Sequence, residues 1–196
     1  HSEGPTIQAN YTFCFELPKL AFLLPENHQA TGEWFVESIG LDKKFMDSLP
    51  TNNHYVDRQS ILPLVKSRSK YSHKGTFGHA LLWVASHGKT GAAVLAARAT
   101  LRAGAGLLTV HIPRCAYTTL QTAIPEAMVS SDSAAEYLSE VPDLEPYKAI
   151  GVGCGIGTGE NTAIGLEQLL ERATVPLVLD ADALNTIAAN PDLLQK

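Results

Sequence analysis

The stretch ALLWVASHGKTGAAVLAARATLRAGAGLLTVHI, residues 80–112, has two apolar runs on either side of an alanine-rich segment. The first run, 80–85, has the length and character of a buried strand, and 107–112 predicts a second strand. The alanine-rich residues 91–103 predict a helix that ends at Gly104. A strand, a helix and a strand in this order form a β-α-β unit with parallel strands and a right-handed crossover.

The alternation of strand and helix continues along the chain. Apolar runs at 147–152 and 175–180 predict two further strands, and residues 160–173 between them predict a helix. Another helix is expected over 183–189. We therefore predict that residues 77–196 form part of an open, mostly parallel α/β sheet with helices on both faces.

Three loops leave the carboxyl ends of these strands, at 86–91, 153–159 and 180–185. In open parallel sheets, ligands bind beyond the carboxyl ends of the strands. We expect the three loops to converge on one pocket.

The second loop belongs to a run of alternating glycines, which are Gly151, Gly153, Gly155, Gly157 and Gly159. Glycine lets backbone N–H groups approach a ligand, and a helix start favours an anion such as phosphate. A flexible turn is the alternative. The spacing excludes the G-x-G-x-x-G dinucleotide fingerprint, because the third glycine would fall on Ile156 or Thr158.

The first loop contains Gly88-Lys89-Thr90, which looks like the end of a P-loop. A P-loop needs a glycine five residues before Gly88, and Trp83 stands there, so the spacing excludes this motif as well. The small residues that follow, Gly91 and Ala92, either let a ligand reach the start of the helix or let the helix pack closely on the sheet.

Polar residues in other segments could also carry chemistry. Asp182 can cap the next helix, and Asp180 and Asn185 can bind a hydroxyl, an amide or a Mg²⁺-bound phosphate. Lys74, just before the first strand, is a possible phosphate contact, with a simple glycine turn as the alternative. His111 lies inside a strand, which is more typical of a satisfied core residue than of a catalyst.

The N-terminal part differs in character. Residues 1–55 have a β-rich, aromatic pattern, since 11–15 and 33–39 alternate in chemistry. Residues 56–72 have the composition of a linker, and the α/β pattern belongs to residues 73–196.

Composition limits the classes of function. The chain has 196 residues, 45% of them hydrophobic, and a net charge of -5, which offers no electrostatic footprint for nucleic acid. No apolar stretch is long enough to span a membrane. Three widely spaced cysteines predict no structural zinc site and fit a reducing cytoplasm, where we expect the protein to reside.

Several segments together resemble the ADP-dependent NAD(P)H-hydrate dehydratases, in the order that this family shows. They are 73–78, 91–109, 125–128, 153–157 and 180–185. One departure is Cys154, where the family usually has proline.

Residues 9–19 and 32–42 look like the tail of the NAD(P)H-hydrate epimerase domain, a Rossmann-like domain that bacterial members place ahead of the dehydratase. Asn10 stands where that pattern has Asp, and Cys14 stands at the position of a Ser or Thr potassium ligand.

The resemblance implies a ribokinase-like fold and repair of nicotinamide nucleotides. The S-hydrate of NAD(P)H would be dehydrated at the expense of ADP (or ATP) with Mg²⁺, a lyase reaction, and the preceding domain would epimerise the hydrates with K⁺. By resemblance, the substrate-binding residues are Ala92, Gly153, Gly155, Gly157, Asp182 and Asn185. Lys74, Gly91 and Asp180 are candidates for nucleotide or phosphate contact, and Cys14 for the potassium position.

The family's His-Pro-Gly-Glu segment and its Gly-Gly-x-Gly-Asp base do not occur in residues 1–196. We expect a fragment that holds half of the dehydratase site, is inactive by itself and forms homo-oligomers, since a cut sheet exposes an edge strand. One alternative is a small-molecule kinase of the ribokinase superfamily that acts on a vitamin precursor. Another is a non-catalytic scaffold whose glycine loops serve only packing.

Overall fold

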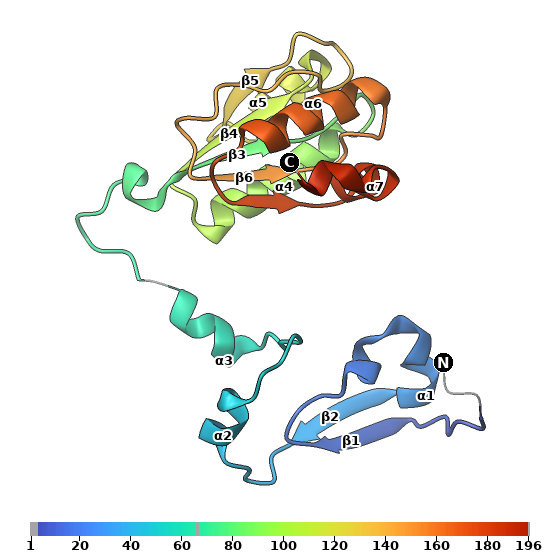
Figure 1. Ribbon diagram of the computed structural model, residues 1–196. Coiled ribbons are helices and arrows are strands. Elements are labelled where there is room, and N and C mark those ends of the chain that lie inside the picture. The colour runs from blue at the N-terminus through green and yellow to red at the C-terminus, as the bar shows by residue number, and fades with distance from the viewer. Residues whose placement is uncertain (1–3, 66, 196) are drawn as a thin grey trace. The chain divides into compact units, whose positions relative to one another are not determined.

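The computed structural model describes residues 4–65 and 67–195. The chain divides into two compact units, His1–Ser67 and Arg68–Lys196, which are coloured blue to teal and teal to red in Figure 1. The boundary falls inside the predicted linker, 56–72.

The larger unit is built on a sheet of five parallel strands in the order β5-β4-β3-β6-β7. The strands are β3 (His79–Trp83), β4 (Leu107–Ile112), β5 (Met128–Ser131), β6 (Ala149–Val152) and β7 (Leu177–Leu179). Because every pair is parallel, all five carboxyl ends lie at one edge of the sheet, which we call the rim.

Two helices cover each face of the sheet. They are α4 (Thr90–Ala103) and α5 (Tyr117–Ala123) on one face, and α6 (Glu160–Arg172) and α7 (Asp182–Ala189) on the other. The alternation of side chains along β3 explains this, because neighbouring residues point to opposite faces. Leu82 packs with Ala93 of α4, whereas Trp83 packs with Leu166 of α6.

The predicted open parallel sheet with helices on both faces is therefore confirmed. Two elements were missed, α5 and the edge strand β5. Their segments are rich in threonine and serine and lack a continuous apolar run. Short 3-10 helices complete the unit at η4 (Lys74–Phe77), η5 (Arg114–Ala116) and η6 (Pro191–Gln195).

The smaller unit has two parallel strands, β1 (Tyr11–Phe15) and β2 (Glu33–Glu37), where the sequence predicts strands. Short helices make the unit less β-rich than expected. They are η1 (Leu20–Leu23), η2 (Pro25–Asn27), α1 (His28–Thr31), α2 (Lys43–Ser48), α3 (Arg58–Ile61) and η3 (Leu62–Leu64).

Aromatic side chains lie on an open face of this small sheet. Phe13 stacks on Phe35 with ring centroids 5.2 Å apart, yet 66% of Phe13 and 63% of Phe15 are exposed. Parallel sheets are normally covered on both faces, and a two-stranded sheet is marginally stable at best. The described residues of this unit therefore leave an apolar face uncovered.

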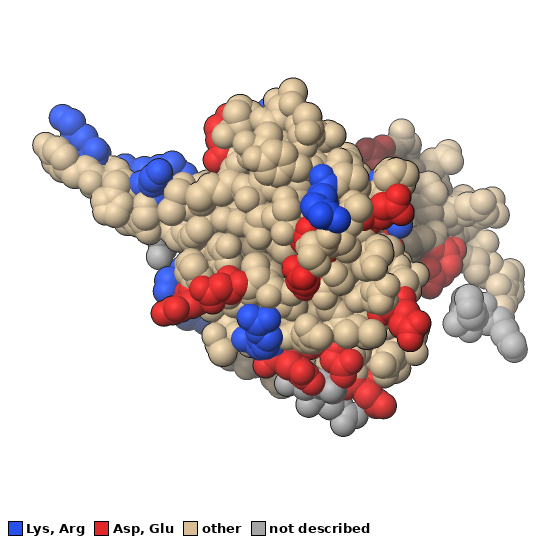
Figure 2. All heavy atoms as spheres, turned by 90° about the horizontal axis from the view of Figure 1, so that it is seen from above, with Lys and Arg blue, Asp and Glu red and all other residues tan. Residues whose placement is uncertain are grey.

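Charged side chains are scattered over the face drawn in Figure 2 and do not gather in one area. None of the helices formed by residues 4–65 and 67–195 has the length and apolar character needed to cross a bilayer.

Candidate ligand site at the rim of the sheet

The loops after β3, β6 and β7 meet at the rim. Ser86 Oγ donates a hydrogen bond to the carbonyl oxygen of Gly155 at 2.7 Å, which joins the first loop to the second. The N–H of Gly157 donates to Oδ2 of Asp182 at 2.8 Å, which joins the second loop to the third. The predicted meeting of the three loops is confirmed, and a single pocket lined by all of them stays a prediction.

Close packing explains two of the alternating glycines. Gly153 has φ +122°, and a Cβ there would collide with the carbonyl oxygen of Asp180 and lie 2.8 Å from Cβ of Ala183. A Cβ on Gly155 would lie 2.9 Å from Cβ of Ala92. The first half of the loop is thus packed between its neighbours, contrary to a merely flexible turn.

Gly157 is required for a different reason. Its φ is +79°, but no heavy atom lies within 4 Å of the position that a Cβ would take. Left-handed backbone favours glycine because a side chain there is strained. This conformation lets the N–H of Gly157 reach Asp182, while the space beside the residue stays open.

Two alanines at the rim also have a left-handed backbone. Ala85, shortly after β3, has φ +75°, and Ala181, shortly after β7, has φ +48°. Such conformations cost about 1–3 kcal/mol each and cluster at functional sites. Both strained residues lie where strands enter the loops of the candidate site.

Asp182 joins the three loops. Its Oδ2 accepts from the N–H of Gly157 and lies 3.1 Å from Nζ of Lys89, and its Oδ1 accepts from Nδ2 of Asn185 at 3.3 Å. The hydrogen bond from Gly157, with a smaller contribution from Lys89, holds the pKa of Asp182 below its ordinary value. The carboxylate is therefore ionised at neutral pH.

The prediction that Asp182 caps the helix was wrong. Helix α7 begins at Asp182 itself, with Ala181 at the cap position and no side-chain cap. The side chain turns across the rim instead, where it accepts hydrogen bonds from the N–H of Gly157 and the ammonium of Lys89. Asn185 lies one helical turn after Asp182, and its side-chain amide donates to the same carboxylate.

Asp180 is exposed at the end of β7, and Sγ of Cys154 lies 3.8 Å from its Oδ2. Burial and the charge of Asp180 raise the pKa of the Cys154 thiol, so this thiol is neutral at physiological pH. The cysteine that replaces the expected proline is thus an unreactive neighbour of Asp180.

The start of α4 forms the remaining side of the site. Ala92 packs against Gly155, whereas Gly91 faces open space, since nothing lies within 4 Å of the position of a Cβ. The helix has 14 residues and no side-chain cap, so its first N–H groups can donate hydrogen bonds to an anion.

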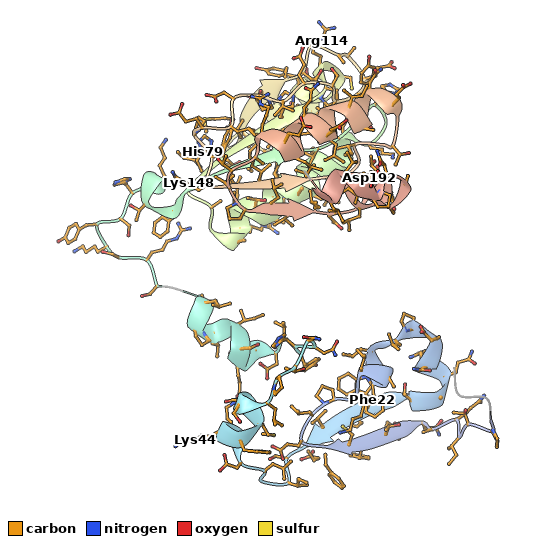
Figure 3. All side chains as sticks on the ribbon, viewed as in Figure 1. Phe22, Lys44, His79, Arg114, Lys148 and Asp192 are labelled. Carbon is orange, nitrogen blue, oxygen red and sulfur yellow. The ribbon has the colours of Figure 1, made fainter. Side chains whose placement is uncertain are left out.

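Lys74 does not belong to this site. It lies in η4 before β3, at the amino end of the sheet, the end where Figure 3 labels His79 and Lys148. The strand spans about 16 Å, more than a lysine side chain can reach. Gly78, which ends η4, has φ +75°, so this segment is the glycine turn that enters the strand.

Cys14 lies in the smaller unit, on β1. Its thiol is buried and donates to the carbonyl oxygen of Leu17 at 3.0 Å. Residues 4–65 and 67–195 contain no group of three or more His, Cys, Asp or Glu side chains that could hold a metal ion. The potassium position stays a prediction.

The sequence analysis missed a fourth segment at the rim, residues 132–140. Asp132, only 1% exposed, follows β5 and accepts hydrogen bonds from the N–H groups of Ala134, Ser139 and Glu140 at 2.7–2.9 Å. The carbonyl oxygen of Glu136 in turn accepts from the N–H of His87 at 2.7 Å. A buried carboxylate therefore folds this segment against the first loop.

His111 completes this network on β4. Its Nδ1 lies 2.9 Å from Oγ of Ser130, and its Nε2 lies 3.4 Å from Oδ2 of Asp132. Burial lowers the pKa of His111 although the nearby Asp132 opposes the shift. Burial tends to raise the pKa of Asp132, but its hydrogen bonds from Ser139, Ala134 and Glu140 hold it below the ordinary value. The pair is thus a neutral imidazole beside a carboxylate, and His111 is a satisfied core residue, as expected.

This pair predicts a pH dependence. A depressed histidine pKa means that the unfolded chain takes up a proton first as the pH falls below the ordinary value of 6.5. His111 therefore leaves stability intact above pH 6.5 and lowers it as the pH falls toward its folded pKa. In His111→Asn, the free energy of unfolding should decrease less between pH 7 and pH 5, as measured by urea unfolding at each pH. Equal decreases in both proteins would contradict this assignment.

The fold and the rim define an α/β protein with an open parallel sheet and a cluster of loops at its carboxyl edge. In agreement, a ribokinase-like superfamily protein from Enterococcus faecalis V583 shares the fold with a TM-score of 0.56 at 23% identity, over 65% of this chain and 45% of that one. The family model of the NAD(P)H-hydrate dehydratases matches residues 80–196, more than half of the chain. The chain belongs to the NAD(P)H-hydrate dehydratase family.

Individual relatives agree with this assignment. The bifunctional NAD(P)H-hydrate repair enzyme Nnr of Moorella thermoacetica is 34% identical over 97% of this chain and 38% of its own length. The enzyme of the same name from Coxiella burnetii is 32% identical over 96% and 38%. The ADP/ATP-dependent NAD(P)H-hydrate dehydratase of Bacillus subtilis, co-crystallized with ATP/Mg²⁺, is 30% identical with a TM-score of 0.55, over 64% of this chain and 45% of that one. The chain thus spans less than two fifths of the length of these repair enzymes.

Proposed function

We propose that the rim of the Arg68–Lys196 unit is the part of an NAD(P)H-hydrate dehydratase site that binds the hydrated dinucleotide. The observation that supports this most is the meeting of three loops around one ionised carboxylate, Asp182, beside the uncapped start of α4. Family membership supplies the substrate class, and the B. subtilis relative supplies ADP or ATP as the co-substrate.

The groups at the rim suit the parts of such a ligand. The ionised carboxylate of Asp182 and the amide of Asn185 can bind the hydroxyls of a ribose or of the hydrated ring. The N–H groups of Gly155 and Gly91 suit phosphate oxygens, whereas the N–H of Gly157 holds Asp182 in place. Catalysis of phosphoryl transfer is mostly positioning and charge stabilisation, which fixed backbone donors supply.

Magnesium fits the donor set of the third loop. Mg²⁺ takes one or two carboxylates together with substrate phosphates, and the exposed Asp180 lies two residues from Asp182. When bound, the ion would neutralise charge on the nucleotide phosphates. We propose Asp180 as the residue that faces it.

We further propose that the catalytic base and the ADP site lie outside these 196 residues, so that the chain by itself binds substrate without turnover. The share of 38% that the chain covers in the repair enzymes supports this. Dehydration of the hydrate by the purified chain would refute it.

The smaller unit is proposed to be the tail of an epimerase domain. The bifunctional relatives align with 96–97% of the chain, and the uncovered aromatic face beside β1 needs further strands or helices to bury it. We also propose that the epimerase domain binds potassium at the Cys14 position. The protein is proposed to reside in the cytoplasm and to assemble into a homo-oligomer.

Binding tests the central claim. The (S)-hydrate of NADPH should raise the unfolding temperature of the larger unit, with about 2.7 kcal/mol of stabilisation at one hundred times the Kd. Asp182→Asn should weaken binding of the hydrate, whereas Asp143→Asn, an exposed carboxylate away from the three loops, should not. If the hydrate does not bind to the chain but the full protein phosphorylates a small alcohol with ATP, the kinase alternative is correct.

A further inference from the structure

Lys89 lies at the rim although the P-loop spacing excludes it from that motif. It immediately precedes α4 and takes the cap position of this helix. Its Nζ lies 3.1 Å from Oδ2 of Asp182, which is 93 residues further along the chain. The side chain of Lys89 is 51% exposed and that of Asp182 is 19% exposed.

The two partners of Oδ2 differ in mobility. The N–H of Gly157 is part of a loop that is packed against α4 and α7 through Gly155 and Gly153. The ammonium of Lys89 is carried by four methylene groups and is half exposed, so it can change partners at small cost. If a ligand hydroxyl is to reach Oδ2, the ammonium is the partner that gives way.

A second partner for this ammonium is at hand in the proposed substrate. A dinucleotide carries a pyrophosphate, and the open space beside Gly91 and Gly88 lies next to Lys89 in the chain. An ammonium that leaves Asp182 would otherwise be unpaired near a carboxylate that has just bound a neutral hydroxyl. A phosphate oxygen restores the charge balance at the same rim.

We propose that Lys89 is a specificity-determining residue that exchanges partners when substrate binds. In the ligand-free chain it neutralises Asp182, and in the complex it pairs with a phosphate of the hydrated dinucleotide while Asp182 accepts a hydroxyl. This role rests on the proposed function. It makes the site prefer ligands that carry both a phosphate and the hydrated ring, since a phosphate-free ligand must break the ion pair without compensation.

The variant Lys89→Met removes the charge and keeps the length of the side chain. Isothermal titration with the (S)-hydrate of NADH should show binding that is weaker by about tenfold, with a smaller dependence on salt concentration. The phosphate-free hydrate of reduced nicotinamide riboside should bind the variant as well as the original chain, or better. Lys148→Met is the matched control, because Lys148 is exposed at the opposite edge of the sheet and should change neither ligand's affinity.

The pattern across the two ligands decides the proposal. If Lys89→Met weakens binding of both ligands equally, Lys89 only positions Asp182. If it leaves binding of the dinucleotide unchanged, Lys89 does not contact the ligand. Either result overturns the exchange of partners. An equal unfolding temperature for variant and original chain should accompany the loss of affinity.

Inorganic pyrophosphate separates this inference from the proposed function. Pyrophosphate should shift the NMR resonance of the Gly157 amide in the original chain and not in Lys89→Met. If pyrophosphate shifts the Gly157 resonance but the hydrate does not bind, the proposed substrate is wrong, whereas the exchange of partners by Lys89 is supported. No shift in the original chain would refute the exchange, even where the hydrate binds.

Discussion

Gly153→Ala is expected to destabilise the larger unit by about 3 kcal/mol or more and to abolish binding of the hydrated dinucleotide. Two costs combine at this residue. Its φ of +122° strains any side chain, and a Cβ would collide with the backbone oxygen of Asp180 and press on Ala183 at 2.8 Å. Relief of the collision must move the start of α7, and Asp182 moves with it.

Gly159→Ala is the matched control in the same loop. Its φ is -69°, and no heavy atom lies within 4 Å of the position of a Cβ. The change in stability should stay within about 1 kcal/mol, because the loss of a glycine cap and the lower entropy of the unfolded chain nearly cancel. Urea unfolding followed by the fluorescence of Trp83, in a Trp34→Phe background, reports on the larger unit alone. Equal stabilities for the two variants would contradict the packing of the loop.

Asp132→Ala should destabilise the larger unit by about 3 kcal/mol. The substitution leaves three backbone N–H groups without their acceptor, those of Ala134, Ser139 and Glu140. The whole segment 132–140 would lose its anchor, so hydrogen exchange at the amide of His87, which donates to Glu136, should become faster.

The effect of Asp132 depends on pH in a defined direction. Its pKa is held below the ordinary value of 3.8, so its contribution is present above pH 3.8 and is lost as the pH falls through the folded pKa. The difference in stability between Asp132→Ala and the original chain should therefore become smaller as the pH falls below 3.8. Asp143→Ala, which removes an exposed carboxylate just beyond this segment, should change stability by less than about 0.5 kcal/mol at any pH. A comparable loss in that variant would show that the buried network is not the cause.

The fold of the larger unit could be predicted because the sequence patterns that indicate its strands and helices are local. The apolar runs that became β3, β4 and β6 and the alanine-rich run that became α4 are each visible within a few consecutive residues of the chain. Parallel strands with helical crossovers then place every carboxyl end at one edge, so the meeting of the loops around Ser86, Gly155 and Asp182 was predictable too.

The partners of individual side chains were not predictable from these local signals. Asp182 was expected to cap α7 but bonds Gly157, Lys74 was expected near phosphate but lies at the opposite edge, and Lys89 was set aside but pairs with Asp182. The burial of Asp132 against His111 was likewise missed, because its segment has no period of its own.

The sequence by itself thus determined four of the five strands and three of the four α-helices described in the larger unit, their parallel arrangement and the edge at which the loops meet. These follow from apolar runs along the chain and from the chirality of the crossover. Only the tertiary structure decided which side chains form hydrogen bonds and ion pairs with one another. A hydrogen bond or ion pair depends on a few ångströms between atoms that are 25 to 93 residues apart, as in the contacts of Asp182 with Gly157 and Lys89, and no spacing along the chain encodes that distance.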